Sequence, residues 1–168
     1  MSIQIIYARP DLIPSFYKAL DRVAREEIYI EKVEAPPFSD VESFQQKLIA
    51  QQWPNYYAVK PGPSGEQEVV GWADITRPQN ERLAHRGFLG MGLVAEARGQ
   101  GLGTQLLQAA LSHAKGMDIE KVELSVYSSN LPAIALYQKC GFREMGRIRH
   151  YRKYKDQYFD SVEMELFF

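Results

Sequence analysis

Three glycines stand at alternate positions, Gly99, Gly101 and Gly103, where a leucine pattern of helical spacing begins. Glycine is the least favourable ordinary residue inside a helix, so a plain connector rarely needs three of them there. Glycines let the backbone approach a ligand closely, and the first four N–H groups of a helix have no acceptor within it. Because the positive end of the helix dipole adds to these N–H groups, the segment from Arg98 to Thr104 predicts an anion-binding loop between a strand and a helix.

Two common phosphate-binding patterns do not explain this loop. A Walker-type loop ends in Gly-Lys-Ser/Thr, and here Thr104 follows Gly103 with no lysine between them. The stretch Gly90–Ala95 fits the dinucleotide-binding pattern Gly-x-Gly-x-x-Gly/Ala, but its glycines fall inside an apolar strand and not at a strand–helix turn. We interpret that match as accidental. The guanidinium of Arg98 and the hydroxyl of Thr104 are the side-chain groups expected to add to the anion site.

The other patterns predict an α/β (α+β) fold in a single domain, residues 1–168. Apolar periodicity and turn residues predict five strands and a terminal hairpin, at Gln4–Arg9, Tyr56–Lys60, Glu68–Thr76, Phe88–Val94, Lys121–Tyr127 and Arg143–Phe168. They predict helices from Asp11, from a Ser39–Glu42 capping box, and over Leu102–Lys115 and Leu131–Lys139. This order indicates a mixed, mostly antiparallel central sheet of about seven strands with helices on both faces.

Composition excludes several classes of protein. The 168 residues are 45% hydrophobic and carry a net charge of −1, so no overall field favours nucleic acid or a membrane surface. The single cysteine, Cys140, cannot form an internal disulfide and suits a reducing compartment. The three histidines have no metal-ligand spacing, so no metal is expected. With no apolar run of signal-peptide or membrane-span length, we expect a cytoplasmic protein.

Two motifs together carry a resemblance to a known family. Arg98-Gly99-Gln100-Gly101-Leu102-Gly103 is similar to the Gln/Arg-x-x-Gly-x-Gly/Ala signature of the GCN5-related N-acetyltransferase (GNAT) superfamily. Downstream, Asn130–Phe142 resembles the Asn-x-x-Ala-x-x-Leu-Tyr-x-x-x-Gly-Phe element of the same superfamily. The two motifs have the expected order and lie one helix and one strand apart. The resemblance is strong from Phe88 to Phe142.

The resemblance implies acetyl-CoA as cosubstrate and a role for each matching residue. Its pyrophosphate would be bound by the loop, made of Arg98, Gly99, Gln100, Gly101, Leu102, Gly103 and Thr104. Backbone groups of Leu93 and Val94 would hold the acyl arm, and Asn130 would orient it; the alternative is that Asn130 only caps a helix. Tyr137 would contact the cosubstrate and protonate the leaving thiolate; the alternative is an aromatic side chain at a helix–sheet boundary.

The residue that takes the proton of the amine is not evident. Some members that acetylate protein N-termini carry a glutamate five residues before the helix-capping asparagine, and here that position is Ser125. Serine cannot act as a base unaided, which weakens the protein N-terminus reading. Asp74, Glu81 and His85 are alternatives for a base that acts through water, and none is preferred.

The expected function is transfer of an acetyl group from acetyl-CoA to the primary amine of a small molecule, an amino acid or related amine, in a ternary complex. One alternative is a protein N-terminal or lysine acetyltransferase, and a second is a non-catalytic acyl-CoA-binding module. The basic run Arg143–Lys155 is interpreted as a solvated face; if functional, it would favour an amine that bears a carboxylate. The resemblance also leaves room for a homodimer.

Overall fold

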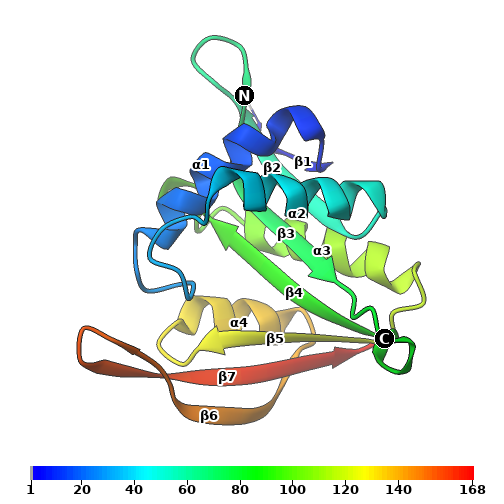
Figure 1. Cartoon of the computed structure of the whole chain (residues 1–168), viewed down its shortest axis with the longest axis vertical. Coiled ribbons are helices and arrows are strands. Elements are labelled where there is room, and N and C mark those ends of the chain that lie inside the picture. Colours follow the sequence, from blue (N-terminus) through cyan, green and yellow to red (C-terminus); the bar gives the residue numbers. More distant parts are fainter. Residues whose placement is uncertain (1) are drawn as a thin grey trace.

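The computed structural model describes residues 2–168 and contains a seven-stranded sheet in the order β1-β2-β3-β4-β5-β7-β6 (Figure 1). Neighbouring strands are antiparallel except β4 and β5, which are parallel. The strands are β1 (Gln4–Tyr7), β2 (Asn55–Pro61), β3 (Gln67–Thr76), β4 (Arg86–Leu93), β5 (Lys121–Tyr127), β6 (Arg143–Tyr154) and β7 (Gln157–Phe167). The α-helices are α1 (Ile13–Ala24), α2 (Phe38–Ala50), α3 (Leu102–Lys115) and α4 (Leu131–Lys139). The mixed, mostly antiparallel sheet predicted from the sequence is confirmed.

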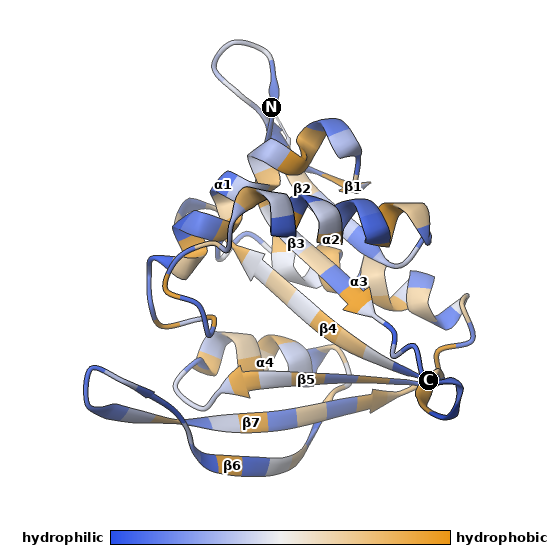
Figure 2. Cartoon of the chain, viewed as in Figure 1, coloured by the Kyte–Doolittle hydropathy of each residue, from blue (hydrophilic) through white to orange (hydrophobic). Residues whose placement is uncertain are grey.

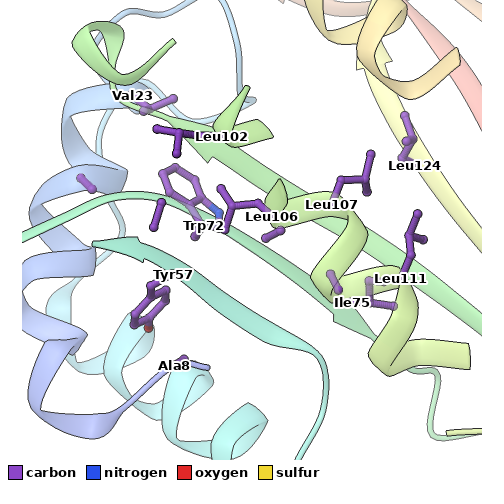
Figure 3. Close-up of a cluster of buried hydrophobic side chains, with 14 of the residues drawn as sticks. Ala8, Val23, Tyr57, Trp72, Ile75, Leu102, Leu106, Leu107, Leu111 and Leu124 are labelled. Carbon is purple, nitrogen blue, oxygen red and sulfur yellow. The ribbon is translucent and has the colours of Figure 1, made fainter. Parts of the chain in front are cut away.

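Helices cover both faces of the sheet, because strands such as β3 carry apolar side chains on both faces. On one face, Phe16 of α1 stacks on Tyr57 with ring centroids 5.2 Å apart and meets Trp72 edge-on at 5.4 Å. Gly71, next to Trp72, points to the other face, where Leu106 of α3 packs closely. Figure 3 shows buried apolar side chains that include Tyr57 and Trp72, with Leu106, Leu107 and Leu111 along α3.

The predicted capping box at Ser39–Glu42 is wrong. Helix α2 begins at Phe38, one residue earlier, and no side chain caps its first turn. The carbonyl of Pro37 accepts hydrogen bonds from the N–H groups of Asp40 and Val41, so the proline starts the helix. Phe38 is fixed there by an edge-on contact with Tyr17 of α1, at 5.3 Å between ring centroids.

The structure explains the accidental dinucleotide pattern in β4. A Cβ on Gly92 would lie 2.5 Å from Cη2 of Trp72, so glycine is required for Trp72 to lie flat against the strand. Gly90 lies opposite Asp74 of β3 in the sheet register. Neither glycine stands at a strand–helix turn, and the pattern serves packing within the sheet.

The parallel pair β4 and β5 separates along its length. The two strands are paired only where Arg86, Gly87 and Phe88 meet Lys121, Val122 and Glu123. Beyond those residues they diverge, as Figure 1 shows, and α4 follows β5 at the open end. Figure 2 shows that β6, at the edge of the sheet, is largely hydrophilic, while the strands around the opening carry apolar residues. The divergence leaves an opening through the middle of the sheet.

Candidate active site

A cavity of about 890 Å³ fills the space between the separated strands. Its walls come from β4 and β5, the glycine loop, α4, the loop between α1 and α2, and strands β6 and β7. A cavity of this size is in the range that holds small ligands and cofactors. The cavity passes from the N-terminus of α3 to the face covered by the α1–α2 loop.

The glycine loop lies on the cavity wall with its backbone N–H groups unused. Gly99 and Gly101 have φ values of +72° and +77°, a conformation that side chains rarely adopt. Among residues 2–168, the N–H groups from Gly99 to Thr104 donate to no acceptor. Gly99, Gly101, Gly103 and Thr104 line the cavity. The predicted combination of bare amides and a helix N-terminus is therefore present, in the form that binds phosphate groups.

The side chains of the two residues between the loop glycines lie elsewhere. Gln100 donates from Nε2 to the carbonyl of Glu96 at 2.7 Å, and the Leu102 side chain is buried in the core. Gly103 allows close packing, because a Cβ there would lie 3.0 Å from Cδ2 of Leu136 on α4, and that side chain would have to shift. Only the backbone of Gln100 and Leu102 is thus available for a ligand.

Arg98 lies at the cavity but its guanidinium already has partners. It forms a two-pronged ion pair with Glu26, at 2.6 and 2.8 Å, and donates to the carbonyl of Leu93 at 2.8 and 3.0 Å. It also lies over the ring of Tyr29 at 4.3 Å. The hydrogen bond with Glu26 raises the pKa of Arg98 above its ordinary value. Arg98 thus joins the end of β4 to the α1–α2 loop, and its positive charge is balanced before any phosphate binds.

Of the two residues predicted to hold the acyl arm, only Leu93 lines the cavity. The N–H of Val94 donates to the carbonyl of Val70 at 3.0 Å, its own carbonyl accepts from Ala97, and its side chain is buried. Val94 therefore has no backbone group left and does not line the cavity. Because successive N–H groups of a strand point to opposite sides, that of Leu93 points away from β3 and into the cavity. Leu93 keeps the predicted placement and Val94 does not.

Asn130 and Tyr137 both line the cavity from α4 and the turn before it. Asn130 caps α4, because its Oδ1 accepts from the N–H of Ala133 at 3.3 Å; its amide nitrogen has no protein acceptor among the described residues. The Tyr137 ring packs against Phe142 at 5.9 Å. Burial raises the pKa of Tyr137 well above its ordinary value, so its phenol stays protonated at physiological pH.

None of the three alternative bases, Asp74, Glu81 and His85, lines the cavity. Asp74 is buried in β3 behind Gly90, and burial raises its pKa to about 7. Ser125 does line the cavity, and directly opposite it in the sheet register stands Glu163 of β7. The sequence analysis missed Glu163. Its signal was the alternation of Ser161, Val162, Glu163 and Met164, which places a serine and a carboxylate on one face of the last strand.

The described residues show neither a metal-binding cluster nor a membrane-spanning helix. Within residues 2–168, no group of three or more His, Cys, Asp and Glu side chains could hold a metal ion. No helix in that range is both long enough and apolar enough to cross a membrane.

Comparison with known proteins identifies the family. Residues 20–142 match the family described as the Acetyltransferase (GNAT) family. An N-alpha-acetyltransferase of Sulfurisphaera tokodaii is 38% identical over 93 residues, which are 50% of this chain and 56% of that relative. This match spans only about half of the relative. An L-amino acid N-acetyltransferase of Escherichia coli is 24% identical over 155 residues, 88% of this chain and 90% of the relative.

Solved structures share the fold over nearly the whole chain. An acetyltransferase of the GNAT family from Streptococcus pneumoniae superposes with a TM-score of 0.88 at 24% identity, covering 99% of this chain and 100% of that one. A phosphinothricin acetyltransferase from Sinorhizobium meliloti, solved with acetyl-CoA, gives 0.87 at 17% identity, over 99% and 88% of the two chains. Since the family match alone covers well over half of the residues, this chain belongs to the acetyltransferase (GNAT) family.

Proposed function

We propose that this acetyltransferase moves the acetyl group of acetyl-CoA to the primary amine of a small molecule, an amino acid or related amine. One observation carries the proposal: a single cavity joins the bare amides of Gly99–Thr104 to Tyr137 and to a row of polar side chains on β5 and β7. The loop amides fit a diphosphate, and the phenol of Tyr137 fits a leaving group that needs a proton. The polar side chains of β5 and β7 fit an acceptor.

The chain fits coenzyme A as a ligand through backbone groups more than through side-chain charge. Six consecutive unbonded N–H groups at the start of α3 supply donors to a diphosphate, strengthened by the helix dipole. The N–H of Leu93 and the free amide nitrogen of Asn130 are proposed to hydrogen-bond the arm that runs between β4 and β5. Arg98 is proposed to position this loop through Glu26 and the Leu93 carbonyl.

Acetyl-CoA, when bound, supplies a thioester carbonyl that an amine can attack. The N–H of Leu93 is proposed to donate to the carbonyl oxygen as negative charge develops on it, an interaction worth ~3 kcal/mol in other acyl-transfer sites. Tyr137, kept protonated by burial, is proposed to give its phenolic proton to the departing sulfur. No step uses Cys140, which packs against the core.

An amine panel tests the proposal. Purified protein with saturating acetyl-CoA is mixed with amino acids, aliphatic and aromatic amines, polyamines and short peptides, and release of free thiol is measured. We expect thiol release with at least one small primary amine, and the acetylated product by mass spectrometry. Binding of coenzyme A without thiol release for any amine would overturn the enzymatic role and leave an acyl-CoA-binding module.

A second acceptor class, the N-terminus of a peptide, is favoured by the 38% identity to the N-alpha-acetyltransferase of Sulfurisphaera tokodaii. The peptides in the panel decide between the two classes. If kcat/KM for a peptide exceeds that for every small amine by tenfold or more, the peptide is the acceptor.

A further inference from the structure

Glu163 of β7 is held in the cavity by two serine hydroxyls. Oγ of Ser125, directly opposite on β5, donates to Oε2 of Glu163 at 2.6 Å. Oγ of Ser161, two residues earlier on β7, donates to Oε1 at 2.6 Å. Both carboxylate oxygens are therefore fixed in direction, and all three residues line the same cavity as Tyr137.

The charge of Glu163 has no counter-ion within the part of the chain that the structure describes. Among residues 2–168, no lysine, arginine or histidine nitrogen forms an ion pair with it. Serine hydroxyls orient a carboxylate but do not neutralise it. A partly buried carboxylate without a counter-ion is a site for a cation supplied by a ligand.

The other cavity carboxylates have other partners. Glu123 pairs with Arg86 at 2.6 Å and with Lys121 at 3.3 Å. Glu31, on the α1–α2 loop, accepts a hydrogen bond from the hydroxyl of Tyr151 on β6. Like Glu163, Glu31 has no cationic partner among residues 2–168, but a hydroxyl donates to only one of its carboxylate oxygens. Glu163 differs because a hydroxyl holds each of its two oxygens.

Glu163 lies beside the opening between β4 and β5. Ser125 stands two residues beyond Glu123, the last β5 residue paired with β4, so it lies where the strands have begun to separate. On the other side of Glu163 the register partner is Gly146 of β6, and a Cβ built there would meet nothing within 4 Å. The carboxylate therefore borders the opening between the strands and has free space beside it.

We propose that Glu163 binds the ammonium group of the acceptor and takes its proton before acetyl transfer, with Ser125 and Ser161 as positioning residues. This inference rests on the proposed function. Members with a glutamate at the Ser125 position would have the carboxylate on β5. Here it comes from the next strand, about 5 Å away across the sheet, and the serine serves to hold it.

The proton balance of this step is complete. One N–H bond of the ammonium breaks and its proton joins a carboxylate oxygen of Glu163, from which it passes to solvent. The neutral nitrogen forms the C–N bond as the C–S bond breaks. The sulfur receives the proton of Tyr137, and the second proton lost by the nitrogen restores the phenol through solvent. One ammonium and one thioester thus give one amide, one thiol and one released proton.

The test compares two acceptors that differ in protonation. The first is the aliphatic amine that wild-type protein acetylates fastest in the panel, which is protonated at pH 7, and the second is phenylhydrazine, which is neutral there. In Glu163→Gln we expect kcat/KM for the protonated amine to fall about 100-fold, in the range of general-base catalysis, and that for phenylhydrazine to change less than about threefold. In the double variant Ser125→Ala/Ser161→Ala we expect kcat/KM for the protonated amine to fall about tenfold, again with little change for phenylhydrazine.

Binding provides a second readout. By calorimetry, Glu163→Gln should bind coenzyme A as wild type does, while the protonated amine binds the coenzyme A complex at least tenfold more weakly. Glu120→Gln, exposed and outside the cavity, is the matched control and should change neither value.

The outcomes separate this inference from the proposed function. If wild type acetylates amines but Glu163→Gln keeps its rate, or loses equally with both acceptors, Glu163 has no role in proton transfer and only this inference fails. If wild type releases no thiol with any amine, the proposed function itself fails.

Discussion

The two ends of the cavity are built by different means. The donor end, at the glycine loop and α4, offers backbone N–H groups from one continuous segment, Gly99–Thr104. The acceptor end, on β5, β6, β7 and the α1–α2 loop, offers side chains that are far apart in the sequence, such as Glu31, Ser125 and Glu163. In the proposed function, backbone geometry would recognise the common cosubstrate, whereas side chains on a fixed frame, which can be replaced, would bind the acceptor.

The loop between α1 and α2 connects the two ends. Glu26 pairs with Arg98 at the donor end, while Glu27 pairs with Lys155 at 2.8 Å and Glu31 bonds to Tyr151 at the acceptor end. Arg152 also donates to the carbonyl of Ile30 at 3.1 Å. The acceptor end is therefore covered by a loop whose neighbouring residues also fix the donor loop.

The largest expected effect is a loss of kcat on substitution of Tyr137, which lines the cavity that joins the two ends. Tyr137→Phe removes the phenolic proton but keeps the ring that packs on Phe142, so we expect kcat to fall about 100-fold or more. Since burial raises the pKa of Tyr137, wild-type activity should show no alkaline loss from this group up to pH 10. Steady-state thiol release over pH 6–10 measures both, and calorimetry should find unchanged coenzyme A affinity. A kcat within threefold of wild type would exclude Tyr137 as the proton donor.

The sequence predicted the donor end better than the acceptor end, for a physical reason. The positive φ of Gly99 and Gly101 favours glycine, and Gly103 allows close packing on Leu136, so a local glycine pattern was enough to predict the loop. Val94 was misassigned because the partner of its N–H, Val70, lies on another strand. Glu163 was missed because its hydrogen bond with Ser125 depends on the register between β5 and β7, which no local pattern specifies. The strand and helix order followed from periodicity, while the start of α2 depended on a contact between Phe38 and Tyr17.

Asp74 belongs to neither end, because it is buried in β3 next to Gly90 and does not line the cavity. It therefore tests whether a buried carboxylate outside the cavity affects stability alone. Its pKa in the folded protein is about 7, above the ordinary value of 3.8, so the folded state binds more protons between these pH values. Stability from this group is therefore present at low pH and is lost as pH rises from about 4 to about 7. Asp74→Asn cannot ionise, so its unfolding free energy relative to wild type should improve on the order of 3 kcal/mol between pH 4.5 and pH 8.

Denaturant titration at both pH values measures this difference, and thiol release provides the functional control. We expect kcat of Asp74→Asn to stay within about twofold of wild type. A tenfold fall in kcat without a pH-dependent gain in stability would place Asp74 in the proton path and contradict the assignment to Glu163.

The donor loop is expected to show a smaller effect that depends on conformation alone. Gly99→Ala/Gly101→Ala adds two methyl groups with no neighbour within 4 Å, so its only cost is a positive φ, about 1 kcal/mol or more at each residue. Either the loop changes conformation or it is destabilised, and the dissociation constant for coenzyme A should rise about tenfold or more. Gly65→Ala, with φ +87° in the β2–β3 turn and equally open space, is the matched control and should leave that constant unchanged. Equal affinities in all three proteins would show that the loop amides do not bind the diphosphate.

The smallest effect concerns the charge of the acceptor end. The cationic side chains that line the cavity, Arg86 and Arg98, are both ion-paired, while Glu31 and Glu163 have no cationic partner among the described residues. A carboxylate next to the reacting amine would meet this negative charge, a repulsion of at least about 1 kcal/mol at ~4 Å, the value in bulk water. Phenethylamine should therefore exceed phenylalanine in kcat/KM by about five- to tenfold, although it is the more basic amine and so is less often unprotonated. Glu31→Gln should reduce that ratio, because it removes one of the two negative charges while leaving Glu163 in place. A preference for phenylalanine would mean that a cation of the basic strand β6 reaches the carboxylate of the acceptor, and would narrow the proposed acceptors to amino acids.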